Sequence, residues 1–143
     1  MYRAPFKHQS MPVLPNLLLA DDEPGVLTTL GMILELDGYN VTRASSAADA
    51  IHHLSNGVRY DVVITDLNME GPDIGLEVAR KALGITPRPV VCICTGYADT
   101  ANAREALEMH VDYFATKPVD IDEFRAAISR LRKQRKLSSK RCA

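Results

Sequence analysis

Leu17-Leu18-Leu19-Ala20-Asp21-Asp22-Glu23 is a run of four apolar residues that ends directly in three acids. Residues 62–66, Val-Val-Ile-Thr-Asp, and 90–95, Val-Val-Cys-Ile-Cys-Thr, have a similar build, and a fourth run covers 111–115. Short apolar runs without alternation are typical of parallel strands that are buried on both faces. Residues 39–44 alternate more, which favours an edge strand. These five segments predict one parallel sheet.

Segments with helical periodicity separate the predicted strands. The first begins with Pro24, which suits a first helical turn, and stops before Gly38, which suits a helix end. Strand and helix alternate five times, which predicts an α/β fold with a five-stranded parallel sheet and helices on both faces. The helices are expected at 24–37, 46–56, 74–83, 99–109 and 120 to about 136.

The composition of the 143 residues, 46% hydrophobic and 24% charged, is that of one globular domain. The formal net charge of −1 hides an uneven distribution. Residues 16–129 hold 8 basic and all 18 acidic residues, whereas 130–143 hold seven basic residues and no acid. We therefore expect a flexible N-terminal extension at 1–15, one domain at 16–131 and a basic C-terminal tail at 132–143.

The basic tail has three interpretations from the sequence alone. It can be a solvated extension of the last helix, an interaction segment for an acidic partner or nucleic acid, or a linker to an output domain. The seven positive charges of residues 130–143 can give weak, salt-sensitive nucleic-acid binding. No aromatic stacking platform or recognition helix accompanies them, so no specific nucleic-acid binding is expected.

Cysteine usage and hydropathy predict the compartment. Cys92, Cys94 and Cys142 form no C-x-x-C pair, and two of them lie in an apolar run, so a reduced, cytoplasmic protein is expected. No apolar stretch reaches the roughly 20 residues that span a bilayer, and residues 1–15 lack the apolar segment of a signal peptide. We expect no association with a membrane.

Polar side chains gather where the predicted strands end. Asp21 and Asp22 follow the first run, Asp66 and Thr95 end two others, and Lys117 follows the last. Because the carboxyl ends of parallel strands share one edge of a sheet, these side chains are expected to converge. Clustered carboxylates favour Mg²⁺, while an ammonium and a hydroxyl group bind phosphoryl oxygens. A carboxylate beside a metal can itself accept a phosphoryl group.

Four segments in this order and spacing resemble the response-regulator receiver domains of two-component signalling, of the single-domain chemotaxis type. The resemblance covers about residues 16–131 and implies a (βα)5 flavodoxin-like fold. The segments are Leu17-Leu18-Leu19-Ala20-Asp21-Asp22-Glu23-Pro24, Asp61-Val62-Val63-Ile64-Thr65-Asp66-Leu67-Asn68-Met69, Thr95-Gly96-Tyr97-Ala98-Asp99 and Tyr113-Phe114-Ala115-Thr116-Lys117-Pro118.

The resemblance implies roles for the acidic residues. Asp66 looks like the phosphoacceptor, and it shares a Mg²⁺ site with two other acids. Asp22 looks like a direct ligand of the ion, and Asp21 like one that acts mainly through water. Asn68 resembles the position whose backbone carbonyl completes the metal shell.

The resemblance also implies a lysine and a two-residue switch. Lys117 would pair with Asp66 and then with the phosphoryl group, and Lys117-Pro118 resembles the family's cis peptide. Thr95 would swing to hydrogen-bond the phosphoryl group, with Phe114 following it inward. The output would appear on the face formed by the helix at 99–109, the strand at 111–115 and the last helix, which is also a candidate homodimer face.

Four positions depart from the family pattern or modulate it. Glu70 stands where the family usually has proline, and the glycine expected after it comes one residue late, at Gly75. The shifted, more acidic loop predicts slower phosphorylation or altered metal affinity. His110 replaces a common glycine, so it either adopts a left-handed conformation or changes the turn before the last strand. Tyr97 is expected to shield the aspartyl-phosphate from water.

The resemblance therefore implies a protein that accepts a phosphoryl group from a sensor histidine kinase or a phosphotransfer protein and then binds a downstream target. It would catalyse only its own phosphorylation and dephosphorylation, and so would not be a turnover enzyme. Two alternatives stay open: a receiver-like module that signals without phosphate, and a Mg²⁺-dependent phosphatase with an aspartate nucleophile. Asp21-Asp22 lacks the D-x-D spacing of such phosphatases.

Overall fold

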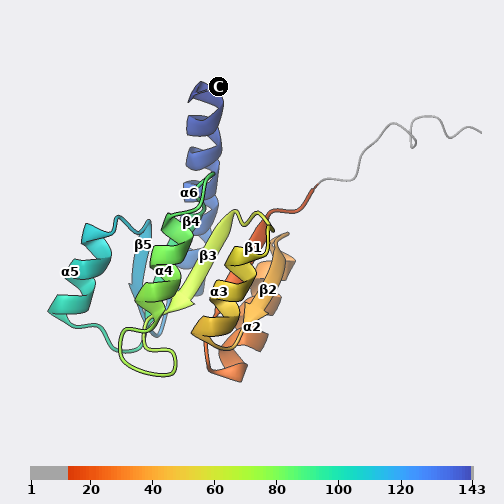
Figure 1. Cartoon of the computed structure of the whole chain (residues 1–143). Coiled ribbons are helices and arrows are strands. Elements are labelled where there is room, and N and C mark those ends of the chain that lie inside the picture. The colour runs from red at the N-terminus through yellow and green to blue at the C-terminus, as the bar shows by residue number, and fades with distance from the viewer. Residues whose placement is uncertain (1–12, 143) are drawn as a thin grey trace, which may run out of the picture.

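The computed structural model describes residues 13–142, so most of the extension predicted at 1–15 lies outside the described residues. Five parallel strands form one sheet in the order β2-β1-β3-β4-β5 (Figure 1). They are β1 (Asn16–Ala20), β2 (Asn40–Ala44), β3 (Val62–Asp66), β4 (Val90–Thr95) and β5 (Tyr113–Thr116). The chain moves outward from β1 to β2 and then returns to β3, so the order reverses between β1 and β3. Ligands of such sheets bind at the carboxyl ends of the strands beside this reversal.

Helices cover both faces of the sheet, as the sequence predicts. Successive side chains of a strand point to opposite faces, which gives two buried clusters. Leu18 and Val63 belong to the cluster under three helices, and Leu17 and Ile64 to the cluster under the other two. The first group is α3 (Ala47–Ser55), α4 (Gly75–Leu83) and α5 (Thr100–Glu108), and the second is α2 (Pro24–Leu36) and α6 (Ile121–Cys142). The predicted edge strand is also confirmed, because within residues 13–142 β2 pairs only with β1.

Local sequence fixes where these helices begin. Pro24 occupies the first turn of α2, where its missing N–H group costs nothing. The Ser46 hydroxyl accepts a hydrogen bond of 3.0 Å from the Asp49 N–H at the start of α3. Asp99 and Asn102 form a reciprocal capping box at the start of α5.

The last strand begins at Tyr113, two residues later than predicted, because the chain is still turning after α5. The Val111 N–H donates to the Ala106 carbonyl at 3.3 Å and so still belongs to the helix end. His110 has φ 64°. Of the two alternatives predicted for this position, the residue therefore adopts the left-handed conformation that glycine usually supplies.

Replacing His110 by glycine is expected to raise the free energy of unfolding by about 1 kcal/mol, because the left-handed conformation is strained for a residue with a Cβ atom. Urea denaturation monitored by circular dichroism measures the change. Arg104→Gly, at an exposed position inside α5, is the matched control, and it should lower the free energy of unfolding by about 1 kcal/mol. A His110→Gly variant that is also destabilised would contradict the prediction.

Helix α6 continues past the sheet to Cys142 and thus beyond the end expected near residue 136 (Figure 1). The beginning of the basic tail packs on the body of the domain. Arg135 donates to the carbonyls of Arg88 and Pro89 at 2.9 Å each and to Asp112 Oδ1 at 2.7 Å. The Arg132 guanidinium lies 5.7 Å from the centre of the Tyr39 ring. Two positive charges in the described part of this segment are therefore held against the domain.

Across residues 13–142, no helix combines the length and the apolar character needed to cross a membrane.

Candidate functional site

Three carboxylates meet at the carboxyl ends of β1 and β3, as predicted. One oxygen from each of Asp21, Asp22 and Asp66 can be chosen so that all three lie within 4.8 Å of one another. The parallel pairing of Ala20 with Thr65 explains this, because it places the next residue of each strand side by side. Asp21 and Asp66 are buried and Asp22 is exposed, so one edge of the cluster faces solvent.

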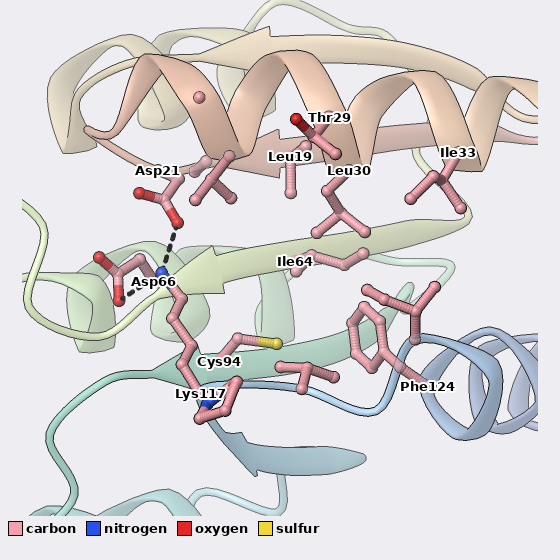
Figure 2. A pocket seen from close by; sticks show the side chains of 16 residues that line it. Leu19, Asp21, Thr29, Leu30, Ile33, Ile64, Asp66, Cys94, Lys117 and Phe124 are labelled. Carbon is pink, nitrogen blue, oxygen red and sulfur yellow. Dashed lines mark hydrogen bonds and ion pairs between the residues drawn. The ribbon is translucent and has the colours of Figure 1, made fainter.

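Lys117 supplies the positive charge of the site, but its closest partner differs from the expected one. Its Nζ donates to Asp21 Oδ2 at 2.8 Å and lies 3.8 Å from Asp66 Oδ1 (Figure 2). A third acid, Glu23, lies 3.7 Å away. The predicted cis peptide between Lys117 and Pro118 is present. Lys117 therefore spans two of the carboxylates and hydrogen-bonds only one.

A cavity of about 350 Å³ adjoins the site between α2, the sheet and the segment after Lys117. Figure 2 shows Asp21, Asp66 and Lys117 at one end of it, with apolar side chains along the rest. Its apolar lining includes Leu19, Leu30, Ile33, Ile64 and Phe124. Asp66 thus lies between a polar crevice and an apolar wall.

The surroundings of Asp66 raise the pKa of its carboxyl group. Burial is the largest cause, since it disfavours the charged form, and the negative charges of Asp21 and Asp22 act in the same direction. The positive charge of Lys117 opposes them. Burial alone would lower the pKa of Lys117, but its hydrogen bond to Asp21 and the neighbouring carboxylates together raise it.

Asp66→Asn is therefore expected to be more stable than the native chain at pH 7 in the presence of a chelator. The folded chain holds the Asp66 proton to higher pH than the unfolded chain does, so its stability falls as pH rises from about 4 through the raised pKa. The free energy of unfolding falls by at most about 1.4 kcal/mol per pH unit in this range, and the neutral amide of the Asp66→Asn variant removes this pH dependence. Urea denaturation at pH 7 and pH 4 measures the difference, which should shrink at pH 4. Equal stability at pH 7 would contradict the prediction.

The hydroxyl group of Thr95 is turned toward the loop that follows β4. It donates to the Tyr97 carbonyl at 3.0 Å and accepts from the Tyr97 N–H at 3.1 Å and from Asn68 Nδ2 at 3.2 Å. Thr95 is fully buried, whereas Tyr97 is 70% exposed. Phe114 is half-buried against the cluster under α3, α4 and α5. The switch roles of Thr95 and Phe114 and the shielding role of Tyr97 stay predictions.

In the loop from β3 to α4, the glycine comes one residue later than in the family pattern. Gly75 nevertheless lies against the backbone of Asp66. A Cβ atom on Gly75 would lie 1.9 Å from the Asp66 carbonyl oxygen, so the backbones touch there. Glu70 and Asp73 both have left-handed backbones, with φ of 68° and 60°. The loop therefore bulges between Asp66 and Gly75.

Glu70 lies at the rim of the site, but its charge does not join the acidic cluster. The carboxylate accepts a 2.8 Å hydrogen bond from the Ala47 N–H, in the first turn of α3, where a helix favours negative charge. The Glu70 N–H, which proline would lack, donates to Asp22 Oδ2 at 3.0 Å. The loop thus orients Asp22, a contact that sequence reasoning did not foresee.

Asn68 contributes its side chain to the loops rather than to the acids. Its Oδ1 accepts from the Asp73 N–H at 3.1 Å, and its Nδ2 donates to Thr95 and to the Tyr97 carbonyl. Asp73 also accepts from Asn102 Nδ2 at 3.3 Å. Sequence reasoning missed Asp73 and Asn102, because nothing local marks a loop acid and a helix amide as partners 29 residues apart. The backbone carbonyl of Asn68 stays the predicted metal contact.

Comparisons with known proteins agree with this geometry. A profile of the response regulator receiver domain matches residues 17–129. The transcriptional regulatory protein GlrR of Escherichia coli is 38% identical over 113 residues, which cover 79% of this chain and 25% of that protein. KdpE of Mycobacterium tuberculosis is 35% identical over 119 residues, covering 80% and 51%. The chain thus spans between a quarter and a half of these relatives.

Solved structures give the same result. A receiver domain protein described as CheY-like from Methanospirillum hungatei superposes with a TM-score of 0.82 at 25% identity, covering 88% of this chain and 99% of that one. A receiver domain from Clostridium thermocellum has a TM-score of 0.77 at 34% identity, covering 87% and 98%. The matches extend across both the sheet and the segments that carry the acids and the lysine, and by them the chain belongs to the receiver domains of two-component response regulators.

Proposed function

We propose that Asp66 is the phosphoacceptor of this receiver domain and takes its phosphoryl group from a phosphohistidine of a sensor histidine kinase or a phosphotransfer protein. The observation that carries the proposal is a buried carboxylate at a strand end, with two further carboxylates and one ammonium group around it. Phosphoryl transfer requires mainly positioning and neutralisation of charge, and these are the properties of this arrangement.

The donor set fits Mg²⁺. The ion takes oxygen ligands, and three carboxylate oxygens within 4.8 Å of one another carry more negative charge than the single Lys117 ammonium group neutralises. Asp21, Asp22, Asp66 and the backbone carbonyl of Asn68 would hold it, with Asp22 kept in place by the Glu70 N–H. When bound, Mg²⁺ supplies positive charge to the phosphoryl oxygens.

The residues of the chain then have defined tasks. A carboxylate oxygen of Asp66 forms a bond to phosphorus while the bond from phosphorus to the donor nitrogen breaks. Lys117, already between Asp21 and Asp66, neutralises negative charge on the transferring group. The Thr95 hydroxyl must leave Tyr97 and Asn68 to reach the phosphoryl oxygens, and Phe114 follows it. The chain acts in signalling and catalyses only its own phosphorylation and dephosphorylation.

The contacts of Glu70 and the exposure of Tyr97 make the modulating roles proposed for these two residues more specific. The Glu70 carboxylate is hydrogen-bonded to the first turn of α3, and the Glu70 N–H is hydrogen-bonded to Asp22. These contacts favour an altered affinity for Mg²⁺ as the effect of Glu70. Tyr97 is exposed beside Thr95, so its ring is available to cover the aspartyl-phosphate once Thr95 has moved.

We further propose that the output face consists of α5, β5 and α6, either for a downstream target or for a second copy of the chain. Leu107, 70% exposed on α5, supports a docking surface there. Arg130, Lys133 and Lys136 stay exposed on α6 and allow weak contact with an acidic partner or nucleic acid. Free thiols at Cys92 and Cys94 support a cytoplasmic location.

Intact mass spectrometry after incubation with Mg²⁺ and phosphoramidate, a small donor with a phosphorus–nitrogen bond, tests the proposal. We expect one phosphoryl adduct, formed in Mg²⁺ and absent in a chelator. A chain that takes up no phosphoryl group from any small donor or phosphohistidine protein would instead be a phosphate-independent module.

A further inference from the structure

Asp73 joins the loop after β3 to the first turn of α5. Its N–H donates to Asn68 Oδ1 at 3.1 Å, and its Oδ1 accepts from Asn102 Nδ2 at 3.3 Å. Asp73 has a left-handed backbone, with φ 60°, and makes both contacts. We call this hydrogen-bonded series, Asn68–Asp73–Asn102, the tether.

One end of the tether is rigid. Asn102 is only 3% exposed, and its Oδ1 accepts from the Asp99 N–H at 2.9 Å within the capping box of α5. With its oxygen fixed by Asp99, the amide nitrogen of Asn102 has a defined direction, toward Asp73. The position of Asp73 is therefore set by a buried residue of a helix rather than by the loop alone.

The other end of the tether reaches the switch hydroxyl. Because Asn68 Oδ1 is fixed by the Asp73 N–H, its Nδ2 faces the opposite side, where it donates to Thr95 Oγ1 at 3.2 Å and to the Tyr97 carbonyl at 3.1 Å. The tether thus adds a bond to the two that Thr95 already makes with Tyr97.

We propose that Asp73 is a positioning residue for phosphoryl transfer, which through Asn68 holds the Thr95 hydroxyl away from Asp66 in the unphosphorylated chain. The inference rests on the proposed function, in which that hydroxyl must reach the phosphoryl group. Because the tether stabilises only the unphosphorylated arrangement, cutting it shifts the population toward the other arrangement and by linkage favours phosphorylation.

Two substitutions of Asp73 separate its hydrogen bond from its charge. Asp73→Gly suits φ 60° and removes the bond to Asn102, whereas Asp73→Asn keeps an acceptor oxygen, tolerates that φ and removes only the charge. Loss of one such bond should raise the initial rate of phosphoryl uptake from phosphoramidate about three- to tenfold in Asp73→Gly. Asp73→Asn should stay within about twofold of the native rate.

A second readout needs no phosphate. In unphosphorylated protein with ¹³C-labelled threonine methyl groups, the Thr95 resonance, assigned through Thr95→Ser, should shift in Asp73→Gly and stay near its native position in Asp73→Asn. Should Asp73→Gly fail to fold, Asn102→Asp replaces it. That variant keeps the acceptor for Asp99 and loses the donor to Asp73, so the same shift and the same increase in rate are expected.

Three outcomes would overturn the inference: a native rate and resonance in Asp73→Gly, a slower rate in that variant, or equal changes in Asp73→Gly and Asp73→Asn. The last would assign the effect to charge. If the native chain takes up no phosphoryl group at all, the proposed function fails. The Thr95 resonance still decides whether the tether exists.

Discussion

Asp66→Asn is expected to reduce phosphoryl uptake from phosphoramidate by at least about a hundredfold, to the background of the assay. The amide oxygen of asparagine is a poor nucleophile, and the substitution also removes one of the three carboxylates that meet at the ends of β1 and β3. Intact mass at a series of times, with Mg²⁺ in excess, measures the rate.

The matched control for this substitution is Asp122→Asn. The Asp122 side chain is 93% exposed on α6 and pairs only loosely with Arg125, at 3.5 Å, so its uptake should equal that of the native chain. An adduct of native size on Asp66→Asn would show that another residue accepts the group. Turnover of a small phosphomonoester that survives Asp66→Asn would favour the phosphatase alternative.

Gly75→Ala is expected to lower the free energy of unfolding by about 3–5 kcal/mol, a large share of the stability of a domain of this size. The added Cβ atom would lie 1.9 Å from the Asp66 carbonyl oxygen and 2.8 Å from Leu67 Cα. Both are backbone atoms of the segment that carries Asp66, the proposed phosphoacceptor, so no side chain can rotate away to make room. Urea denaturation of the purified variant measures the loss.

Gly84→Ala is the control for this second substitution. A Cβ atom on Gly84 would lie 3.6 Å from the Lys81 carbonyl oxygen, an ordinary van der Waals distance, and the residue already has a right-handed helical backbone, with φ −84°. Its free energy of unfolding should change by less than about 0.5 kcal/mol. If Gly75→Ala were as stable as Gly84→Ala, the loop would have to have moved away from Asp66. The phosphoryl uptake of the variant would then report that movement.

The fold and the main site were predictable because the relevant signals are local. Continuous apolar runs such as Val62–Asp66 identify parallel strands without knowledge of their neighbours. Parallel strands all end at the same edge, so the residue after each run is placed by topology alone. That rule predicts Asp21, Asp22, Asp66, Thr95 and Lys117 at one edge of the sheet before any contact is known. The late start of β5 shows the limit, since a left-handed His110 leaves no mark on hydropathy.

Partner choice within the site was settled only by the tertiary structure. Lys117 hydrogen-bonds Asp21, 96 residues away, and its Nζ lies 3.8 Å from Asp66 Oδ1, a preference that no local feature of the sequence indicates. Glu70 caps α3 instead of adding charge to the cluster, and Asp73 binds Asn102. Such choices depend on where packed elements place short side chains to within a few tenths of an ångström, the distance over which a hydrogen bond forms or fails. Continuous apolar runs in the sequence determined the sheet and the edge at which the polar residues gather, and close packing determined which of the polar groups at that edge bind one another.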